Sequence, residues 1–205
     1  MFQRQLELSK IIIEKSIFLL GPRQTGKSTL LRHALGDCLY LDLLAPALFR
    51  QLASHPEQLI HIVGASQIPI VIDEIQLLPE LLNVVHQLIE SDKNFRFVLT
   101  GSSARKLRSK GVNLLGGRAR MHRLFPLTTQ ELKSDSNFRD WKILLERGGL
   151  PSILESNSPT DDLEAYVTLY LKEEIRSEPI ARSLPEFSRF LTKTQSSSVS
   201  KILFI

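Results

Sequence analysis

Short apolar runs alternate with amphipathic segments over the first 125 residues of the chain. The apolar runs that read as buried strands lie at residues 16–20, 38–42, 68–73, 95–99 and 120–125. Helical patterns occupy residues 4–13, 27–35, 46–53, 56–63 and 80–90. Apolar strands that alternate with helices predict an α/β fold, in which a parallel sheet is covered on both faces.

After Pro126 the chain changes character, and helical patterns follow one another without strands. Helices are expected at residues 128–133, 138–147 and 161–175, with a hinge at 148–151 and one further turn at 187–191. The last segment, residues 192–205, shows no periodicity. We therefore expect a core domain over residues 1–127, a helical region over 128–191 and an irregular tail over 192–205.

Composition and charge are those of an ordinary globular protein, with 42% hydrophobic and 23% charged residues. The net charge of +4 is compatible with a nucleic-acid partner but does not require one. The single cysteine, Cys38, cannot form an intrachain disulfide, and the five histidines show no metal-ligand spacing. No apolar run approaches the roughly 20 residues of a membrane helix. The expectation is a cytoplasmic protein without a membrane partner.

Residues 21–28 read GPRQTGKS and match the phosphate-binding pattern G-x-x-x-x-G-K-[ST]. Glycines let the backbone turn tightly and bring its N–H groups to phosphate oxygens. Lys27 supplies a charge for the β and γ phosphates, Ser28 offers a hydroxyl to Mg²⁺, and the following helix adds the positive end of its dipole. The predicted nucleotide-binding residues are Gly21, Pro22, Arg23, Gln24, Thr25, Gly26, Lys27, Ser28, Thr29 and Thr100.

An acidic pair, Asp73 and Glu74, ends the apolar run IVIDE. Asp73 is predicted to hold Mg²⁺ opposite Ser28, directly or through water. Glu74 is predicted to polarise the water that attacks the γ phosphate. An extra strand at 38–42 separates the phosphate loop from this pair, and no Asn-Lys-x-Asp tetrapeptide for guanine occurs. The pattern favours ATP as the nucleotide and hydrolysis as the reaction.

The sequence LTGSS at 99–103 ends the predicted fourth strand. If that strand lies between the phosphate-loop strand and the acidic strand, Thr100 or Ser102 reaches the γ phosphate or its water. The alternative is an ordinary turn in which Ser102 or Ser103 caps a helix.

Arg118, in LLGGRAR, is the candidate for stabilising transition-state charge on a neighbouring subunit's nucleotide. Other arginines compete with it: Arg105, Arg108, Arg120 and Arg123. The same basic residues, with the stretch 105–110, also allow a nucleic-acid-binding module. That alternative ranks below the others, because no aromatic residue for base stacking is interleaved in the stretch.

These motifs resemble a family of bacterial and archaeal AAA-type ATPases that carry a C-terminal domain of unknown function. The stretches that carry the resemblance are GPRQTGKSTL (21–30), YLDL (40–43), VIDEIQLLPELL (71–82), FVLTGSSARKL (97–107), GGRA (116–119), LFPLTTQEL (124–132), GGLPSIL (148–154) and YLKEEIR (170–176). The resemblance implies a three-layer P-loop ATPase with strand order 5-1-4-3-2 and a small helical lid. It assigns phosphate binding to Lys27, Mg²⁺ to Ser28 and Asp73, and water activation to Glu74.

The resemblance also implies ATP hydrolysis that drives a conformational change, in a protein able to form a homo-oligomer. Beyond residue 191 the chain departs from the family pattern, so it resembles a truncated copy or a fragment. A protein or DNA partner would then be contacted through the missing C-terminal part. The alternative function is a switch that binds ATP, hydrolyses almost none of it and controls a partner through the bound state.

Overall fold

The computed structural model describes residues 2–66, 68–102, 107, 115–133 and 141–168. The chain divides into a unit that holds the sheet (Leu6–Pro22 and Gly26–Leu124) and a helical unit (Met1–Gln5, Arg23–Thr25 and Phe125–Ile205). None of the described helices is long and apolar enough to cross a membrane. The predicted turn at 187–191 and the tail at 192–205 lie outside the described residues.

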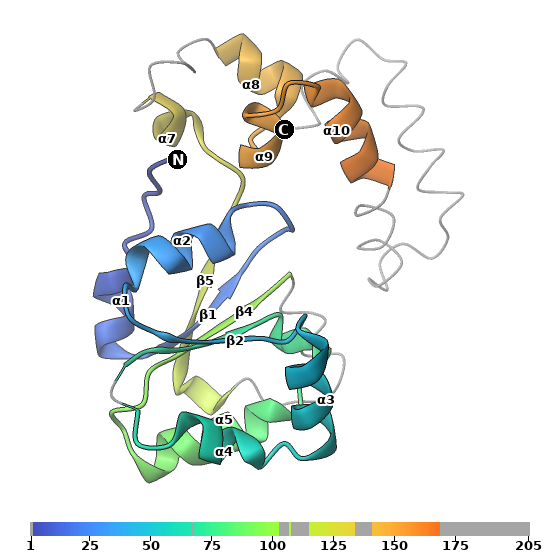
Figure 1. The fold of residues 1–205 in the computed structure, drawn as a ribbon. Coiled ribbons are helices and arrows are strands. Elements are labelled where there is room, and N and C mark those ends of the chain that lie inside the picture. The colour runs from blue at the N-terminus through green and yellow to red at the C-terminus, as the bar shows by residue number, and fades with distance from the viewer. Residues whose placement is uncertain (1, 67, 103–106, 108–114, 134–140, 169–205) are drawn as a thin grey trace. The chain divides into compact units, whose positions relative to one another are not determined.

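The sheet in the described part of the chain has five strands: β1 (Ser16–Leu20), β2 (Leu39–Asp42), β3 (Ile70–Asp73), β4 (Phe97–Gly101) and β5 (Ala119–Arg123). All neighbouring strands are parallel, in the order β2-β3-β4-β1-β5 (Figure 1). This is the expected order 5-1-4-3-2 viewed from the other edge. The strands β1, β3 and β4 are buried along their whole length, which explains their near-continuous apolar sequences.

Helices cover both faces of the sheet (Figure 1). On one face lie α1 (Leu8–Glu14) and α2 (Lys27–Ala34), packed against strand residues such as Ile17 and Val98. On the other lie α3 (Pro46–Ser54), α4 (Gln58–Val63) and α5 (Leu81–Ser91), packed against alternate residues such as Phe18 and Leu99. Because successive strand residues point to opposite faces, one set of strands serves two apolar clusters. The predicted α/β fold is confirmed.

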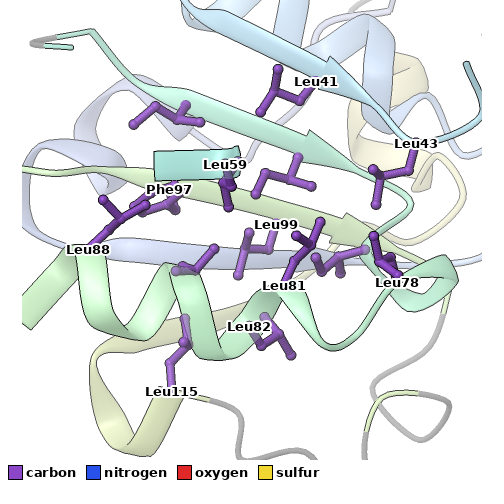
Figure 2. Packing of buried hydrophobic residues seen from close by; sticks show 14 of the residues in the cluster. Leu41, Leu43, Leu59, Leu78, Leu81, Leu82, Leu88, Phe97, Leu99 and Leu115 are labelled. Carbon is purple, nitrogen blue, oxygen red and sulfur yellow. The ribbon is translucent and has the colours of Figure 1, made fainter. Parts of the chain in front are cut away.

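Helix α5 shows how the sequence specifies this packing. Its buried residues, Leu81, Leu82, Val85 and Leu88, recur at helical spacing. Leu81 and Leu88 project from the helix toward Leu99 and Phe97 of β4 (Figure 2). Full burial of one leucine side chain contributes about 2 kcal/mol, so this stripe holds α5 and the 3₁₀ turn η1 (Ile75–Leu77) before it against the sheet.

The predicted boundaries of the fourth strand are wrong by two residues. We expected the strand at 95–99, because Thr100 and Gly101 read as the start of a turn. In the structure both belong to β4, where Thr100 pairs with Leu19 of β1 and Gly101 with Leu20. Pairing with a central neighbour overrides local turn propensity, and it carries Thr100 into the fully buried part of the sheet.

The helical unit contains four described helices: α7 (Thr129–Lys133), α8 (Trp141–Arg147), α9 (Pro151–Leu154) and α10 (Pro159–Tyr166). Its apolar cluster consists of Phe2, Leu127, Leu132, Leu144 and Leu154. The predicted hinge at 148–151 contains both a helix end and a helix start. Gly148 has a φ of +71° just after α8, and Pro151 stands in the first turn of α9. Helix α9 itself was not predicted.

The N-terminal segment corrects a second boundary. Residues 4–7 were expected to be helical, yet α1 begins at Leu8. Glu131 accounts for the difference, because it accepts a hydrogen bond from the Gln5 backbone (3.0 Å) and forms an ion pair with Arg4 (3.3 Å). Glu131 also caps α7 reciprocally with Thr128, as the pattern Thr-x-x-Glu allows. These tertiary contacts hold the segment in a non-helical conformation.

Candidate functional site

The phosphate-loop sequence, residues 21–28, leads from β1 into α2. Gly26 is left-handed at φ 86°, immediately before the first helical residue, Lys27. Gln24 is also left-handed, at φ 62°. A residue other than glycine costs about 1–3 kcal/mol in that conformation, and such strain clusters at ligand sites. Turns of this kind direct backbone N–H groups into a shared concavity that binds anions.

Gly21 is required for a reason that the motif alone does not reveal. Its φ is not in the left-handed region. Instead, a Cβ at this position would overlap the backbone carbonyl oxygen of Leu124, which follows β5. The adjoining backbone is hydrogen-bonded from Leu124 N to Leu20 O (2.7 Å) and from Gly21 N to Gly101 O (3.1 Å). The start of the loop is thus fixed between two neighbouring strands.

Lys27 is only 6% exposed, which is unusual for a lysine. Its Nζ donates hydrogen bonds to the carbonyl oxygens of Gly21 (2.8 Å) and Pro22 (2.9 Å). The ammonium group therefore lies against the start of the phosphate loop. Arg23 and Gln24, at the loop apex, belong to the helical unit. Within that unit, Tyr166 donates to the Arg23 carbonyl (3.4 Å) and Ser152 donates to Gln24 Oε1 (3.0 Å).

Asp73 ends β3 and is 7% exposed. Three hydroxyl groups donate hydrogen bonds to its carboxylate. Ser28 Oγ reaches Oδ2 (3.1 Å), Tyr40 also reaches Oδ2, and Thr100 Oγ1 reaches Oδ1. The two predicted Mg²⁺ ligands, Ser28 and Asp73, are therefore adjacent, although 45 residues separate them in the chain.

Tyr40 was missed by sequence reasoning as a site residue. Burial, followed by the hydrogen bond to Asp73, raises the pKa of Tyr40 well above its ordinary value. The hydroxyl, which is protonated at neutral pH in any tyrosine of ordinary pKa, is the donor of the hydrogen bond to Asp73. The guanidinium of Arg32 lies 5.7 Å from the centre of the tyrosine ring, a cation–π distance that favours the observed ring position. The signal that could have found it is a strand tyrosine two residues before Asp42, on the strand next to β3.

The backbone of Glu74 is left-handed, with φ 60° and ψ 43°. Its N–H donates to Thr100 Oγ1 (3.1 Å), and its Oε2 accepts a hydrogen bond from Gln76 Nε2. Thr100 thus contacts both acidic residues. The strand order places β4 between β1, which precedes the phosphate loop, and β3, which carries the acidic pair, and this is the position that the sensing hypothesis required. Gln76 was not predicted to belong to the site.

Ser102 follows β4 and is 9% exposed. Its hydroxyl is buried and has no hydrogen-bond partner among the described residues. A buried polar atom without a partner is costly, and a ligand would remove that cost. Ser103, the alternative cap, lies outside the described residues, as do Arg105, Arg108 and the basic stretch except Leu107.

Arg118 lies away from these residues. It precedes β5, at the end of the sheet where the strands begin, and its side chain pairs there with Glu90 of α5. The pairing with Arg118 lowers the pKa of the Glu90 carboxyl. Asp73 and the phosphate loop lie instead at the carboxyl ends of their strands, which is the opposite end of the sheet. Arg120, which was predicted to compete with Arg118 for the nucleotide-directed role, pairs with Glu14.

The residues around Asp73 fit a magnesium ion. A hydroxyl and a carboxylate are hard oxygen donors, and Mg²⁺ typically binds one or two protein groups together with water and substrate phosphates. Within the described ranges, no group of three or more His, Cys, Asp or Glu side chains could hold a metal alone. The site suits a cation that arrives with a phosphate ligand.

Comparison with known proteins identifies relatives of this chain in sequence and in fold. Two uncharacterized proteins, from Mycobacterium bovis and Mycobacterium tuberculosis, are each 30% identical over 166 residues. The match covers 78% of this chain but 36% of each relative, so the chain spans about a third of their length. The solved structure of the Aeropyrum pernix Orc1 protein in complex with DNA shares the fold at 13% identity. Its TM-score is 0.50, and the match covers 95% of this chain and 72% of that one.

A family model described as an AAA domain matches residues 14–133, more than half of the chain. That segment contains every strand of the described sheet, the phosphate loop and the acidic pair. The chain belongs to the AAA domain family of P-loop ATPases.

Proposed function

We propose that this chain binds ATP with Mg²⁺ on residues 21–28 and hydrolyses it, with Glu74 as the general base. The observation that carries the proposal is the 3.1 Å hydrogen bond between Ser28 Oγ and Asp73 Oδ2. It joins the phosphate loop to the acidic strand in the arrangement that P-loop enzymes use to hold Mg²⁺.

Each group has a separate task in this reaction. The loop backbone and Lys27 would bind the β and γ phosphates, and Ser28 and Asp73 would hold Mg²⁺, whose chemical contribution would be to neutralise charge on the phosphate oxygens. A water oxygen attacks the γ phosphorus while the bond to the β–γ bridging oxygen breaks. Glu74 takes the proton from that water, and the products are ADP and inorganic phosphate.

Thr100 and Ser102 are proposed to sense the γ phosphate. Thr100 contacts the backbone of Glu74 and the carboxylate of Asp73, so a movement of one is transmitted to the other. The hydroxyl of Ser102 offers a buried donor that no described residue uses. We further propose that hydrolysis drives a conformational change in which the contacts of Arg23 and Gln24 with α9 and α10 take part.

Steady-state ATP hydrolysis by the whole chain with Mg²⁺ tests the proposal, beside equilibrium binding of a fluorescent ATP analogue. Glu74→Gln should retain binding and lose turnover by about 10²–10⁴-fold, the usual contribution of a general base. Lys27→Ala should lose binding, because it removes the buried ammonium group. Exposed residues supply matched controls: Glu80→Gln and Lys93→Ala should behave as the parent.

The results separate the two functions. Turnover that Glu74→Gln abolishes supports an ATPase. Tight binding without turnover in the parent supports the alternative, a non-hydrolysing switch that controls a protein or DNA partner. Unchanged binding in Lys27→Ala contradicts both, since each depends on the phosphate loop.

A further inference from the structure

Glu74 needs more than its position in the sequence to act on a water molecule. Its backbone is left-handed, so the direction of its side chain depends on surrounding contacts rather than on a regular strand or helix. The hydrogen bond from its N–H to Thr100 Oγ1 (3.1 Å) fixes the backbone. A glutamate still has three rotatable side-chain bonds, so a second contact is needed to fix the carboxylate.

Gln76 supplies that second contact. It lies in η1, two residues after Glu74, and its Nε2 donates to Glu74 Oε2. The amide orientation follows from chemistry, because the reversed amide would place two acceptor oxygens face to face. One carboxylate oxygen is thereby held, while no described residue donates a hydrogen bond to the other, Oε1. Such an arrangement fixes the Glu74 carboxylate through Oε2 and leaves Oε1 available to accept a proton from water.

Gly101 makes room for the amide of Gln76. A Cβ on Gly101 would lie closer than 3.0 Å to Gln76 Oε1, a distance that real Cβ atoms essentially never show. The other neighbours of that Cβ, Gln76 Cδ and Leu20 Cδ2, would lie at 3.4 Å, close to ordinary contact. Gln76 Oε1 is buried and has no hydrogen-bond partner among the described residues. The amide is thus confined by Gly101 on one side and Glu74 on the other.

We infer that Gln76 is a positioning residue for Glu74, and that Gly101 is glycine so that the Gln76 amide can reach the carboxylate. The inference rests on the proposed function, in which Glu74 is the base. Gln76 is assigned no direct contact with phosphate or with the attacking water. Its effect on the reaction passes through one hydrogen bond.

The contact itself is tested without nucleotide. Side-chain amide resonances of ¹⁵N-labelled protein are recorded, and the Gln76 pair is identified by its loss in Gln76→Ala. The pair should move in Glu74→Ala, which removes the acceptor, and in Gly101→Ala, which displaces the amide. The amide of Gln87, which is exposed on α5, should stay in place. A Gln76 pair that is unmoved in both variants overturns the inference.

Kinetics test the consequence. Gln76→Ala should lower kcat by roughly 10²-fold, the scale expected for a misplaced catalytic group, while KM and ATP affinity stay near the parent values. Gln87→Ala should have no effect. In a Glu74→Gln background, Gln76→Ala should cost nothing further, because the group it positions is gone. A rise in kcat, or an equal loss in both backgrounds, contradicts a positioning role.

Gly101→Ala distinguishes a loss of Glu74 positioning through Gln76 from a nonspecific disturbance of the fold. Alone, it should lower kcat as Gln76→Ala does. Combined with Gln76→Ala it should add little, because the overlapping side chain is absent. If the two substitutions lower kcat by independent factors that multiply in the double variant, the inference is overturned. If the parent chain hydrolyses no ATP, the proposed function fails, whereas the amide spectra still decide whether Gln76 and Gly101 hold Glu74.

Discussion

Asp73 presents a buried carboxylate to hydroxyl donors from three elements of the sheet unit. Ser28 comes from α2, Tyr40 from β2 and Thr100 from β4. Hydrogen bonds to a charged acceptor are stronger than neutral ones. The carboxylate is therefore oriented before any ligand arrives, which lowers the cost of reorganisation on binding.

Two nearly isosteric substitutions should show how much each donor contributes to the free energy of unfolding. Tyr40→Phe keeps the ring beside Arg32 and removes one half-buried donor, so we expect a loss of about 1–2 kcal/mol in the free energy of unfolding. Thr100→Val should cost more, about 2–4 kcal/mol, because it leaves both the Glu74 N–H and Asp73 Oδ1 without this partner in a fully buried place. Urea unfolding of both variants measures the difference. The opposite order would contradict the network described for Asp73.

At the scale of elements, the phosphate loop depends on a strand that contributes no residue to its motif. Leu124, directly after β5, contacts the loop at Gly21 and hydrogen-bonds to Leu20 at the end of β1. The position of the loop is therefore set by the pairing of β5 with β1 as well as by its own glycines.

Gly21→Ala should for that reason destabilise the fold strongly. Its Cβ would meet a backbone oxygen that no side-chain rotation can move, so we expect a loss of at least about 3 kcal/mol. Gly36→Ala is the matched control. It has φ +57° with nothing within 4 Å, and strain alone should cost about 1 kcal/mol. Thermal unfolding compares the two, and equal effects would show that the Leu124 contact is unimportant.

At the scale of the whole molecule, the parallel sheet separates the candidate residues into two groups. The phosphate loop, Asp73 and Ser102 lie at the carboxyl ends of β1, β3 and β4, where open α/β sheets bind ligands. Arg118 precedes β5 and so lies at the amino ends of the strands. A parallel strand rises ~3.3 Å per residue, so the amino and carboxyl ends of a five-residue strand are roughly 13 Å apart. Arg118 is therefore poorly placed to serve the nucleotide of its own chain.

We expect Arg118 to act on the nucleotide of a second copy of the chain, after release from Glu90. ATPase activity per molecule should then rise with protein concentration, and Arg118→Ala should remove that rise. A mixture of Arg118→Ala with Glu74→Gln should regain activity, because each copy supplies the group that the other lacks. Arg120→Ala, two residues further along and inside β5, is the control. Activity independent of concentration and unchanged in Arg118→Ala would contradict this role.

Much of the fold follows from patterns that are local in the chain. Runs such as 16–20 predict strands because their residues are apolar at successive positions, and the helix at residues 80–90 is predicted by its apolar stripe. The phosphate-loop motif is equally local, since its eight residues are contiguous. These features need no knowledge of what lies across the sheet. The strand order was expected from family resemblance and not from periodicity.

Only the tertiary structure decided which residues complete the site. Tyr40 reaches Asp73 across 33 residues because β2 pairs with β3, and the Gln76 amide meets Gly101 because η1 lies beside β4. The same holds for the errors: Glu131 holds Gln5, 126 residues away, in a non-helical segment, and β1 extends β4 through Gly101. The sequence by itself determined most of the elements and the phosphate loop, since these depend on neighbours in the chain. Contacts between distant residues depend on strand order and register, which only the folded chain specifies.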